Sequence, residues 1–130
     1  MKQEIQLVKE FFDAMKLEYQ NKPKQDVSMT LMLKRIDLIQ EELNEYKQDV
    51  LNRAPLKNRA KELADILYVV YGAILTEGLT DEMDLAFRMV HQSNMSKLDN
   101  YGNPVYNEQG KVIKGENYKP ANLGWLDGCE

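Results

Sequence analysis

Hydrophobic periodicity constrains this chain more than any other feature, because apolar residues recur at helical spacing along most of its length. The clearest case is the stretch 29–51, where the steps alternate between four and three: Met32, Ile36, Ile39, Leu43, Tyr46 and Val50. Such a stripe does not fit a β-strand, in which every second side chain lies on the same face. The pattern therefore predicts an amphipathic helix over 29–51, with Ser28 as its capping residue.

Two further segments show the same helical spacing. Residues 4–20 repeat apolar side chains every three or four positions, and a polar stretch around Pro23 follows them. Residues 55–77 begin at Pro55, which suits a first helical turn, and stop before Gly78, which suits helix termination. Because apolar residues nearly surround the second half of 55–77, we expect it in the centre of a bundle or in an oligomer interface.

The last predicted helix follows Thr80 as its N-cap, has acidic residues in its first turn and reaches about residues 96–98. After Asp99 the chain becomes rich in Gly, Asn and Pro, and the stretch 105–113 predicts a short hairpin with Gly110 in its turn. We therefore predict an all-α fold: a four-helix bundle completed by oligomerisation, followed by an irregular tail that carries a β-hairpin.

Length and charge narrow the class of protein. The chain has 130 residues, of which 29% are charged, so we expect one domain with its helical core at 4–98 and a tail at 99–130. Small helical domains often complete their core with a second copy, which favours a homodimer or a dimer of dimers. The net charge of -4 argues against a nucleic acid polymer as partner.

The apolar stretches of the sequence also bear on where the protein is located. The longest one is too short to span a membrane, and the amphipathic start has no signal-peptide core. We therefore expect a cytoplasmic protein without a membrane partner. The only cysteine, Cys129, excludes an intrachain disulfide, and we interpret it as a free thiol on the tail.

Three glutamates on the predicted helix 29–51 lack the basic neighbours that exposed acids usually have. Glu41, Glu42 and Glu45 have no Lys or Arg three or four residues away, the positions that face them on a helix. At about 100° per residue, Glu42 and Glu45 flank the apolar stripe, whereas Glu41 lies further out. We therefore expect Glu42 and Glu45 to point toward a boundary between helices.

A second acidic pair, Glu62 and Asp65, lies on the predicted helix 55–77 at the same spacing of three. Arg59 and Lys61 are placed to form salt bridges with this pair, so both an ion pair and a metal site remain open for it. Together the two helices can bring four carboxylates around one point. An all-oxygen site of this kind favours Mg2+, with Mn2+ as a substitute.

The single histidine argues against a di-iron centre. Di-iron bundles place a histidine three residues after a glutamate, whereas His91 follows Arg88 at that spacing.

The two acidic motifs, "EELNE" and "ELAD", resemble those of the all-α nucleoside triphosphate pyrophosphohydrolase superfamily. This group contains MazG-like proteins, dimeric dUTPases and phosphoribosyl-ATP pyrophosphohydrolases. The resemblance is strongest over residues 29–98, and the segments "SNMSK" and "GKVIKGENYKP" add to it. It implies Mg2+-dependent hydrolysis between the α and β phosphates of a nucleotide, giving a nucleoside monophosphate and pyrophosphate.

The resemblance also implies roles for individual acids. Glu42, Glu45, Glu62 and Asp65 match the metal ligands of the family, and Glu41 matches the base that orients or deprotonates the attacking water. These roles suit the residues, since cations at the site neutralise polyphosphate charge and stabilise the leaving pyrophosphate.

Candidates for substrate binding lie near the end of the last helix and in the tail. The apolar stripe of that helix becomes polar where Asn94 and Lys97 follow it, and Lys114 and Tyr118 match the family's ending best. A solvated helix end and a solvated loop remain open for these residues. Three aromatic residues are candidates for base stacking, although aromatic residues at helical spacing are more typical of a core. The role of Arg35 stays undecided. The three aromatic residues are Phe11, Phe12 and Tyr46.

The substrate that fits best is a canonical or altered nucleoside triphosphate, hydrolysed by a MazG-like house-cleaning enzyme. Phosphoribosyl-ATP and dUTP are the alternative substrates, although the chain is short for a dimeric dUTPase and its tail is unusual for a compact phosphoribosyl-ATP enzyme. A hypothesis from another class is a non-catalytic helical interaction module, whose acids face water and which binds a partner protein through the helix 55–77.

Overall fold

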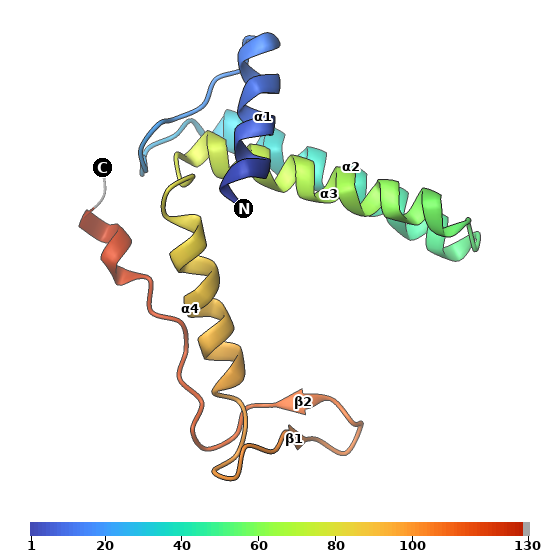
Figure 1. The fold of residues 1–130 in the computed structure, drawn as a ribbon, viewed down its shortest axis with the longest axis vertical. Helices are drawn as coiled ribbons and strands as arrows, with labels where there is room; N and C mark the ends of the chain where they lie inside the picture. The colour runs from blue at the N-terminus through green and yellow to red at the C-terminus, as the bar shows by residue number, and fades with distance from the viewer. Residues whose placement is uncertain (129–130) are drawn as a thin grey trace. The chain divides into compact units, whose positions relative to one another are not determined.

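The computed structural model describes residues 1–128, so Cys129 lies outside the described part of the chain. Within it, four α-helices precede a two-stranded antiparallel hairpin and a short 3-10 helix, which confirms the all-α class with a small hairpin (Figure 1). The elements are α1 (Lys2–Ala14), α2 (Met29–Leu51), α3 (Leu56–Glu77), α4 (Met83–Met95), β1 (Val105–Tyr106), β2 (Val112–Ile113) and η1 (Gly124–Gly128). Of the helices in residues 1–128, none combines the length and the hydropathy needed to cross a membrane.

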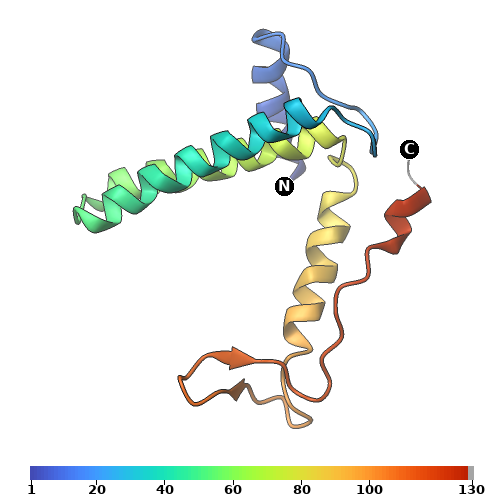
Figure 2. The same cartoon turned by 180° about the vertical axis from the view of Figure 1, so that it is seen from behind.

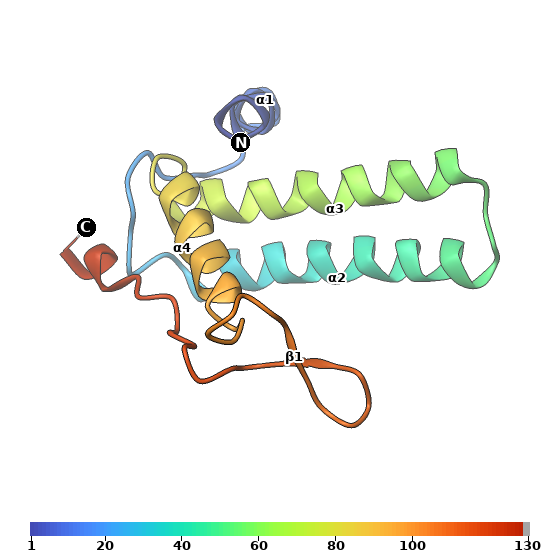
Figure 3. The same ribbon diagram turned by 60° about the horizontal axis from the view of Figure 1, so that its bottom comes forward.

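The chain forms two compact units, Met1–Asp81 and Glu82–Gly128. In the first unit, α2 and α3 run antiparallel and side by side, and α1 lies against α3 (Figures 2 and 3). The core of this unit consists of buried apolar residues from α1, from the loop that follows it and from the end of α3. They are Ile5, Val8, Phe12, Val27, Ile74 and Leu75.

Helix α1 is shorter than the sequence pattern predicts. It ends at Ala14, where Lys16 takes a left-handed φ of 58° and the Leu17 N–H donates to the Phe12 carbonyl at 2.8 Å. This hydrogen bond satisfies one of the last carbonyls of the helix, and the left-handed residue that allows it is not a glycine. The prediction of a helix through residue 20 is therefore wrong at its C-terminal end.

The bounds of α2 agree with the prediction, and those of α3 nearly do. Ser28 occupies the N-cap of α2 without a side-chain capping bond, and Pro55 is the N-cap of α3 instead of a first-turn residue. Gly78 ends α3 as predicted, with a left-handed φ of 76°. A Cβ at Gly78 would overlap the Lys22 carbonyl oxygen, so the loop after α1 can pack here only against glycine.

The second unit combines α4, the hairpin and a tail that runs back along α4 (Figure 1). Helix α4 begins only after Glu82, so the prediction of Thr80 as its N-cap is wrong. Gly110 has the predicted left-handed φ, 78°, in the hairpin turn. The tail is held to α4 by the Trp125 indole, whose Nε1–H donates to the Met89 sulfur at 3.0 Å.

The apolar stripe of α2 is only partly covered within residues 1–128. Ile36 is 56% exposed, Leu43 47% and Val50 46%. The α3 side of α2 also carries Glu42, on the flank of the stripe. Since an apolar stripe on a soluble helix usually packs against another element, the stripe remains available for a partner surface.

Candidate metal and active site

Four carboxylates from α2 and α3 converge between the two helices. One oxygen from each lies within 4.8 Å of the others, and we refer to this set as the carboxylate cluster: Glu42, Glu45, Glu62 and Asp65. The spacing of three residues places each pair on one face of its helix, and the antiparallel packing of α2 and α3 turns the two faces toward each other. The structure thus brings together all four of the acids that the sequence singles out as metal ligands.

The cluster is strongly negative and partly shielded from water. One buried carboxylate oxygen of Glu42 and one of Glu62 has no hydrogen-bond partner. Burial, the adjoining Glu45 carboxyl and the charges of Asp65 and Glu62 together raise the pKa of Glu42 to about 7, burial being the largest cause. Burial also raises the pKa of Glu62, an effect that the positive charge of Lys61 partly offsets.

Lys61 is the cation that pairs with the cluster. Its Nζ lies 2.7 Å from Asp65 and 3.7 Å from Glu62, which confirms the ion pair within α3 that the sequence allowed. Arg59 does not join it, because its Nε–H donates to the Ala54 carbonyl at 3.2 Å. The Lys61 side chain is mostly exposed, so within residues 1–128 one exposed ammonium faces the four carboxylates. An ion pair and a metal site are therefore compatible here.

The donor set fits a hard divalent cation. All four ligands are carboxylates, and the two unpartnered buried oxygens are groups that lose free energy unless a cation or donor compensates them. Neither a sulfur nor an imidazole belongs to the cluster, and His91 lies exposed on α4. These residues suit Mg2+ or Mn2+ better than a metal that prefers nitrogen or sulfur ligands.

Glu41 stands apart from the cluster. It precedes Glu42 on α2, is exposed, and is not among the acids whose oxygens converge. Its position agrees with the helical geometry, which turns it about 100° from Glu42 and toward water.

The four predicted substrate-binding residues belong to the second unit. Asn94 lies in the last turn of α4, and the Lys97 carbonyl accepts a hydrogen bond from Gly115 at 2.9 Å. The Lys114 ammonium lies over the Tyr118 ring, 4.6 Å from its centroid. The end of α4 and the segment after β2 are thus held together. Lys97, Lys114 and Tyr118 therefore lie on neighbouring backbone segments.

Sequence reasoning left Arg35 and the three aromatic residues undecided, and the structure places them. Arg35 is buried, with its guanidinium carbon 4.9 Å from the centroid of the buried Phe12 ring. Phe11 packs edge-on against Tyr68, and Tyr46 is half-buried on α2. The sequence signal that was missed is Gly72, which interrupts an apolar helix where the Phe12 ring needs room.

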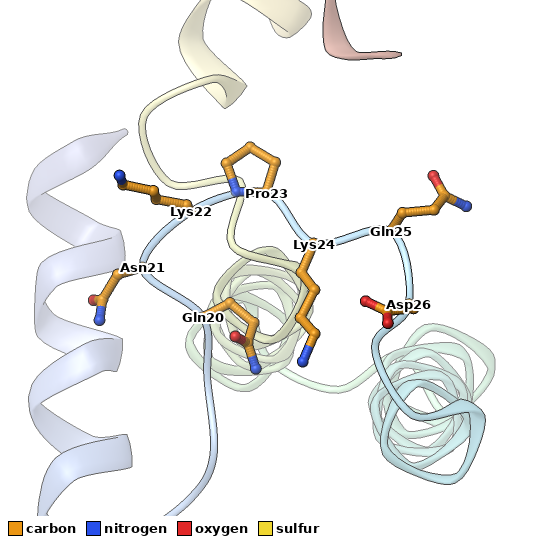
Figure 4. Close-up of a pocket in the computed structure, with 7 residues that line it drawn as sticks. All are labelled: Gln20, Asn21, Lys22, Pro23, Lys24, Gln25 and Asp26. Carbon is orange, nitrogen blue, oxygen red and sulfur yellow. The ribbon is translucent and has the colours of Figure 1, made fainter. Parts of the chain in front are cut away.

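A surface hollow of about 720 Å³ lies away from the carboxylate cluster. The loop between α1 and α2 alone lines it (Figure 4), with Gln20, Asn21, Lys22, Pro23, Lys24, Gln25 and Asp26. Lys24 and Gln20 extend to one side of the loop, whereas Lys22 and Gln25 point in other directions. Because these side chains do not converge on a common point, we do not assign a site to this hollow.

Comparison with known protein families agrees with this geometry. The model of the phosphoribosyl-ATP pyrophosphohydrolase family matches residues 8–94, a span that includes the carboxylate cluster, Glu41 and Asn94. Lys97, Lys114 and Tyr118 lie beyond the matched span. No curated protein matches the chain significantly. Because the match covers well over half of the chain, the protein belongs to the phosphoribosyl-ATP pyrophosphohydrolase family of the MazG-like superfamily, whose members are nucleotide pyrophosphohydrolases.

Proposed function

We propose that this pyrophosphohydrolase acts on nucleoside triphosphates, hydrolysing the bond between the α and β phosphates with Mg2+ as its cofactor and Mn2+ as a substitute. The observation that carries the proposal is the carboxylate cluster, with four oxygens within 4.8 Å and two buried oxygens that lack a partner. Nucleoside monophosphate and pyrophosphate are the products, which suits an enzyme that removes unwanted nucleotides from the pool.

Each acid has a distinct role in this proposal. Glu42, Glu45, Glu62 and Asp65 hold Mg2+, which when bound neutralises phosphate charge and stabilises the leaving pyrophosphate. Glu41 orients a water molecule and accepts its proton as the water oxygen bonds to the α phosphorus. The bond from that phosphorus to the bridging oxygen breaks, and pyrophosphate leaves with the electron pair. The exposed position of Glu41 beside the cluster supports this assignment.

We propose Asn94, Lys97, Lys114 and Tyr118 as the substrate-binding residues. Asn94, Lys97 and Lys114 offer donors or positive charge, and Tyr118 holds the Lys114 ammonium above its ring. Because the segment after β2 is bonded to the end of α4, the lysines of both segments can act on one polyphosphate.

Phosphoribosyl-ATP is the second candidate substrate, because the matching family carries that activity in its name. It offers the same triphosphate bond to the carboxylate cluster, so the two candidates share one site and differ in how the base is recognised. A dUTPase-like preference is the third candidate, and an assay of pyrophosphate release separates it from the other two. A purely non-catalytic interaction module is not supported, given the enzymatic family.

We further propose that the chain assembles as a homodimer or a dimer of dimers. The half-exposed stripe of α2 supports this, as do Leu63 at 46% and Leu67 at 53% exposure on α3. Together they form apolar surface that a second copy of the α2 and α3 pair can cover. Sedimentation equilibrium of the full chain checks the assembly, and a monomer at all concentrations would contradict it.

Pyrophosphate release tests the activity directly. The purified full chain is incubated with Mg2+ and each of a panel of nucleoside triphosphates, with dUTP and with phosphoribosyl-ATP. We expect release from at least one nucleoside triphosphate and none after chelation. Release from phosphoribosyl-ATP alone would move the assignment to that substrate, and release from nothing would end the proposal.

Two substitutions separate the roles of the acids. Glu41→Gln should lower kcat by roughly 100-fold or more while Mg2+ still stabilises the protein, because general-base catalysis contributes on that order. Asp37→Asn, which neutralises another exposed acid of α2, is the matched control and should keep full activity. Equal activity of Glu41→Gln and the control would refute the role of Glu41.

A further inference from the structure

A second cavity, of about 270 Å³, lies between α2 and α3 beyond the carboxylate cluster. Apolar side chains form most of its wall, and two charged residues, Arg35 and Glu77, are also part of it. The apolar residues that α2 contributes are Met29, Met32, Leu33 and Ile36. Apolar walls with a few polar groups are typical of sites for small ring systems.

Arg35 is a buried cation without an anion. It is 7% exposed, and no carboxylate or carbonyl within residues 1–128 forms an ion pair or a side-chain hydrogen bond with it. Its Nε is buried and unpartnered, and burial lowers the pKa of the guanidinium. The ring of Phe12 is its favourable contact, and stacking does not use its N–H donors. A ligand with acceptor atoms would satisfy those donors.

The packing around Arg35 is arranged to hold the guanidinium in place. Gly72 lies inside α3, where a Cβ would come within 3.2 Å of the Phe12 ring and 3.6 Å of an Arg35 terminal nitrogen. Glycine is unfavourable in a helix interior, and here it makes room for the Phe12 ring, over which the Arg35 guanidinium lies. The guanidinium plane is therefore fixed by its neighbours before any ligand binds, which lowers the entropic cost of binding.

Glu77 adds the opposite polarity to the same cavity. It lies at the last position of α3 and is exposed, and its carboxylate has no ion pair or hydrogen bond in the described part of the chain. The cavity therefore presents a planar group with several donors and an acceptor-only carboxylate, with apolar side chains between them.

The cavity and the carboxylate cluster lie along the same boundary of α2 and α3. Arg35 precedes Glu42 by seven residues, which is nearly two helical turns and about 10 Å at a rise of 1.5 Å per residue. The two residues therefore share a face of α2. On α3, Gly72 follows Asp65 by the same interval. A ribose can bridge this interval between a base in the cavity and phosphates at the cluster.

The geometry points to the cavity as a nucleobase site that prefers guanine, with Arg35 and Glu77 as its specificity-determining residues. Guanine carries two adjacent acceptors, O6 and N7, which match a guanidinium in a bidentate pair. Its N1–H and amino group are donors for the Glu77 carboxylate. Adenine and cytosine carry an amino donor where guanine has O6, so they do not match the guanidinium. Uracil has an oxygen at that place but no second acceptor beside it, so it cannot form the bidentate pair. This inference rests on the proposed function.

Steady-state kinetics with Mg2+ test the preference in the wild-type full chain. The substrates are GTP, ITP, 7-deaza-GTP, ATP, CTP and UTP. We expect GTP and ITP to exceed ATP in kcat/KM by roughly 10- to 100-fold, the range that one bidentate pair supports. Because 7-deaza-GTP lacks N7, it should lose much of this advantage, mainly through a higher KM.

Variants identify the two residues. Arg35→Met should abolish the difference in kcat/KM between GTP and 7-deaza-GTP, and Arg35→Lys should restore part of it. Glu77→Gln should lower the kcat/KM for GTP relative to that for ITP, because ITP lacks the amino group that Glu77 accepts from. Lys34→Met, which removes the exposed charge of the adjacent residue, is the matched control and should keep the preference.

A binding measurement without metal distinguishes this inference from the proposed function. In the presence of EDTA, isothermal titration calorimetry should show GMP binding at least tenfold tighter than AMP to wild type but not to Arg35→Met. If no triphosphate releases pyrophosphate but GMP is still preferred, only the proposed function fails. Equal affinity for GMP and AMP, or an active wild type that treats GTP and 7-deaza-GTP alike, would overturn the inference even if Arg35→Met does not fold.

Discussion

Replacing Glu42 by glutamine tests the electrostatics of the carboxylate cluster, because the change removes one negative charge and keeps the shape of the side chain. Without metal, the four acids repel one another, and Glu42→Gln should stabilise the fold. With Mg2+, the variant lacks a ligand and should gain less stability than the wild type. The order of stability of the two proteins should therefore reverse when Mg2+ is added.

The structure sets the size of the effect without metal. Two carboxylates 4.8 Å apart repel by about 0.9 kcal/mol in water and about 3.5 kcal/mol at an effective dielectric constant of about 20. The rise in the pKa of Glu42 from 4.5 to about 7 corresponds to about 3.4 kcal/mol as an upper limit. Water reaches Glu45, and Lys61 supplies a counter-charge, so we expect about 1–2 kcal/mol.

The pH dependence of this effect has a definite sign. The folded-state pKa of Glu42 is raised, so folding favours its neutral form, and this stabilisation is fully present below about 4.5. It is lost as the pH rises toward about 7, where Glu42 ionises beside its neighbours. Glutamine mimics the neutral form. The advantage of the variant should therefore be small near pH 4.5 and complete above pH 7.

Urea denaturation of both proteins at pH 8 and at pH 4.5, with EDTA and with Mg2+, measures all of these differences. The Mg2+-induced increase in the free energy of unfolding should be much smaller in the variant, because a ligand that binds only the folded state must stabilise it. Equal increases in both proteins would exclude Glu42 as a ligand. A variant less stable than the wild type in EDTA at pH 8 would refute the repulsion argument.

Two further substitutions probe the same unit. Lys61→Met removes the ammonium that competes with Mg2+ for the carboxylate cluster. Calorimetry should therefore show Mg2+ binding a few-fold more tightly to the variant. Unchanged or weaker binding would mean that the lysine supports the site. Gly78→Ala should lower the free energy of unfolding by about 2 kcal/mol or more, because its φ is left-handed and a Cβ would overlap the Lys22 carbonyl. Gly110→Ala has a similar φ but open space around it, so its smaller cost in the same urea experiment is the control, and equal costs would refute the overlap.

The helices show where local pattern was sufficient and where it was not. The bounds of α2 followed from its periodicity, and the end of α3 followed from Gly78, since glycine in a left-handed conformation is a local stop signal. The end of α1 had no such signal, because Lys16 closes the helix by adopting a left-handed φ itself. The start of α4 was wrong for a related reason: the segment after Gly78 forms a turn through Thr80 before the helix begins.

The candidate site was predictable because it depends on a short-range rule. Residues three apart on a helix share a face, so the acidic pairs of α2 and α3 could be recognised without knowing how the helices pack. Helical angles also separated Glu41 from Glu42. The metal-binding and catalytic roles of these acids remain predictions until the substitutions are measured.

The sequence by itself determined the helices, the helix pair that carries the acids and the charge that the site must accommodate. Only the tertiary structure decided how far the neighbouring helices cover α2, which left half of the apolar stripe exposed and buried Arg35. The physical reason is that periodicity records which side chains avoid water but not which neighbour covers them. A buried cation such as Arg35 has no periodic signature, because its position depends on Phe12 and Gly72, which lie far away in the sequence.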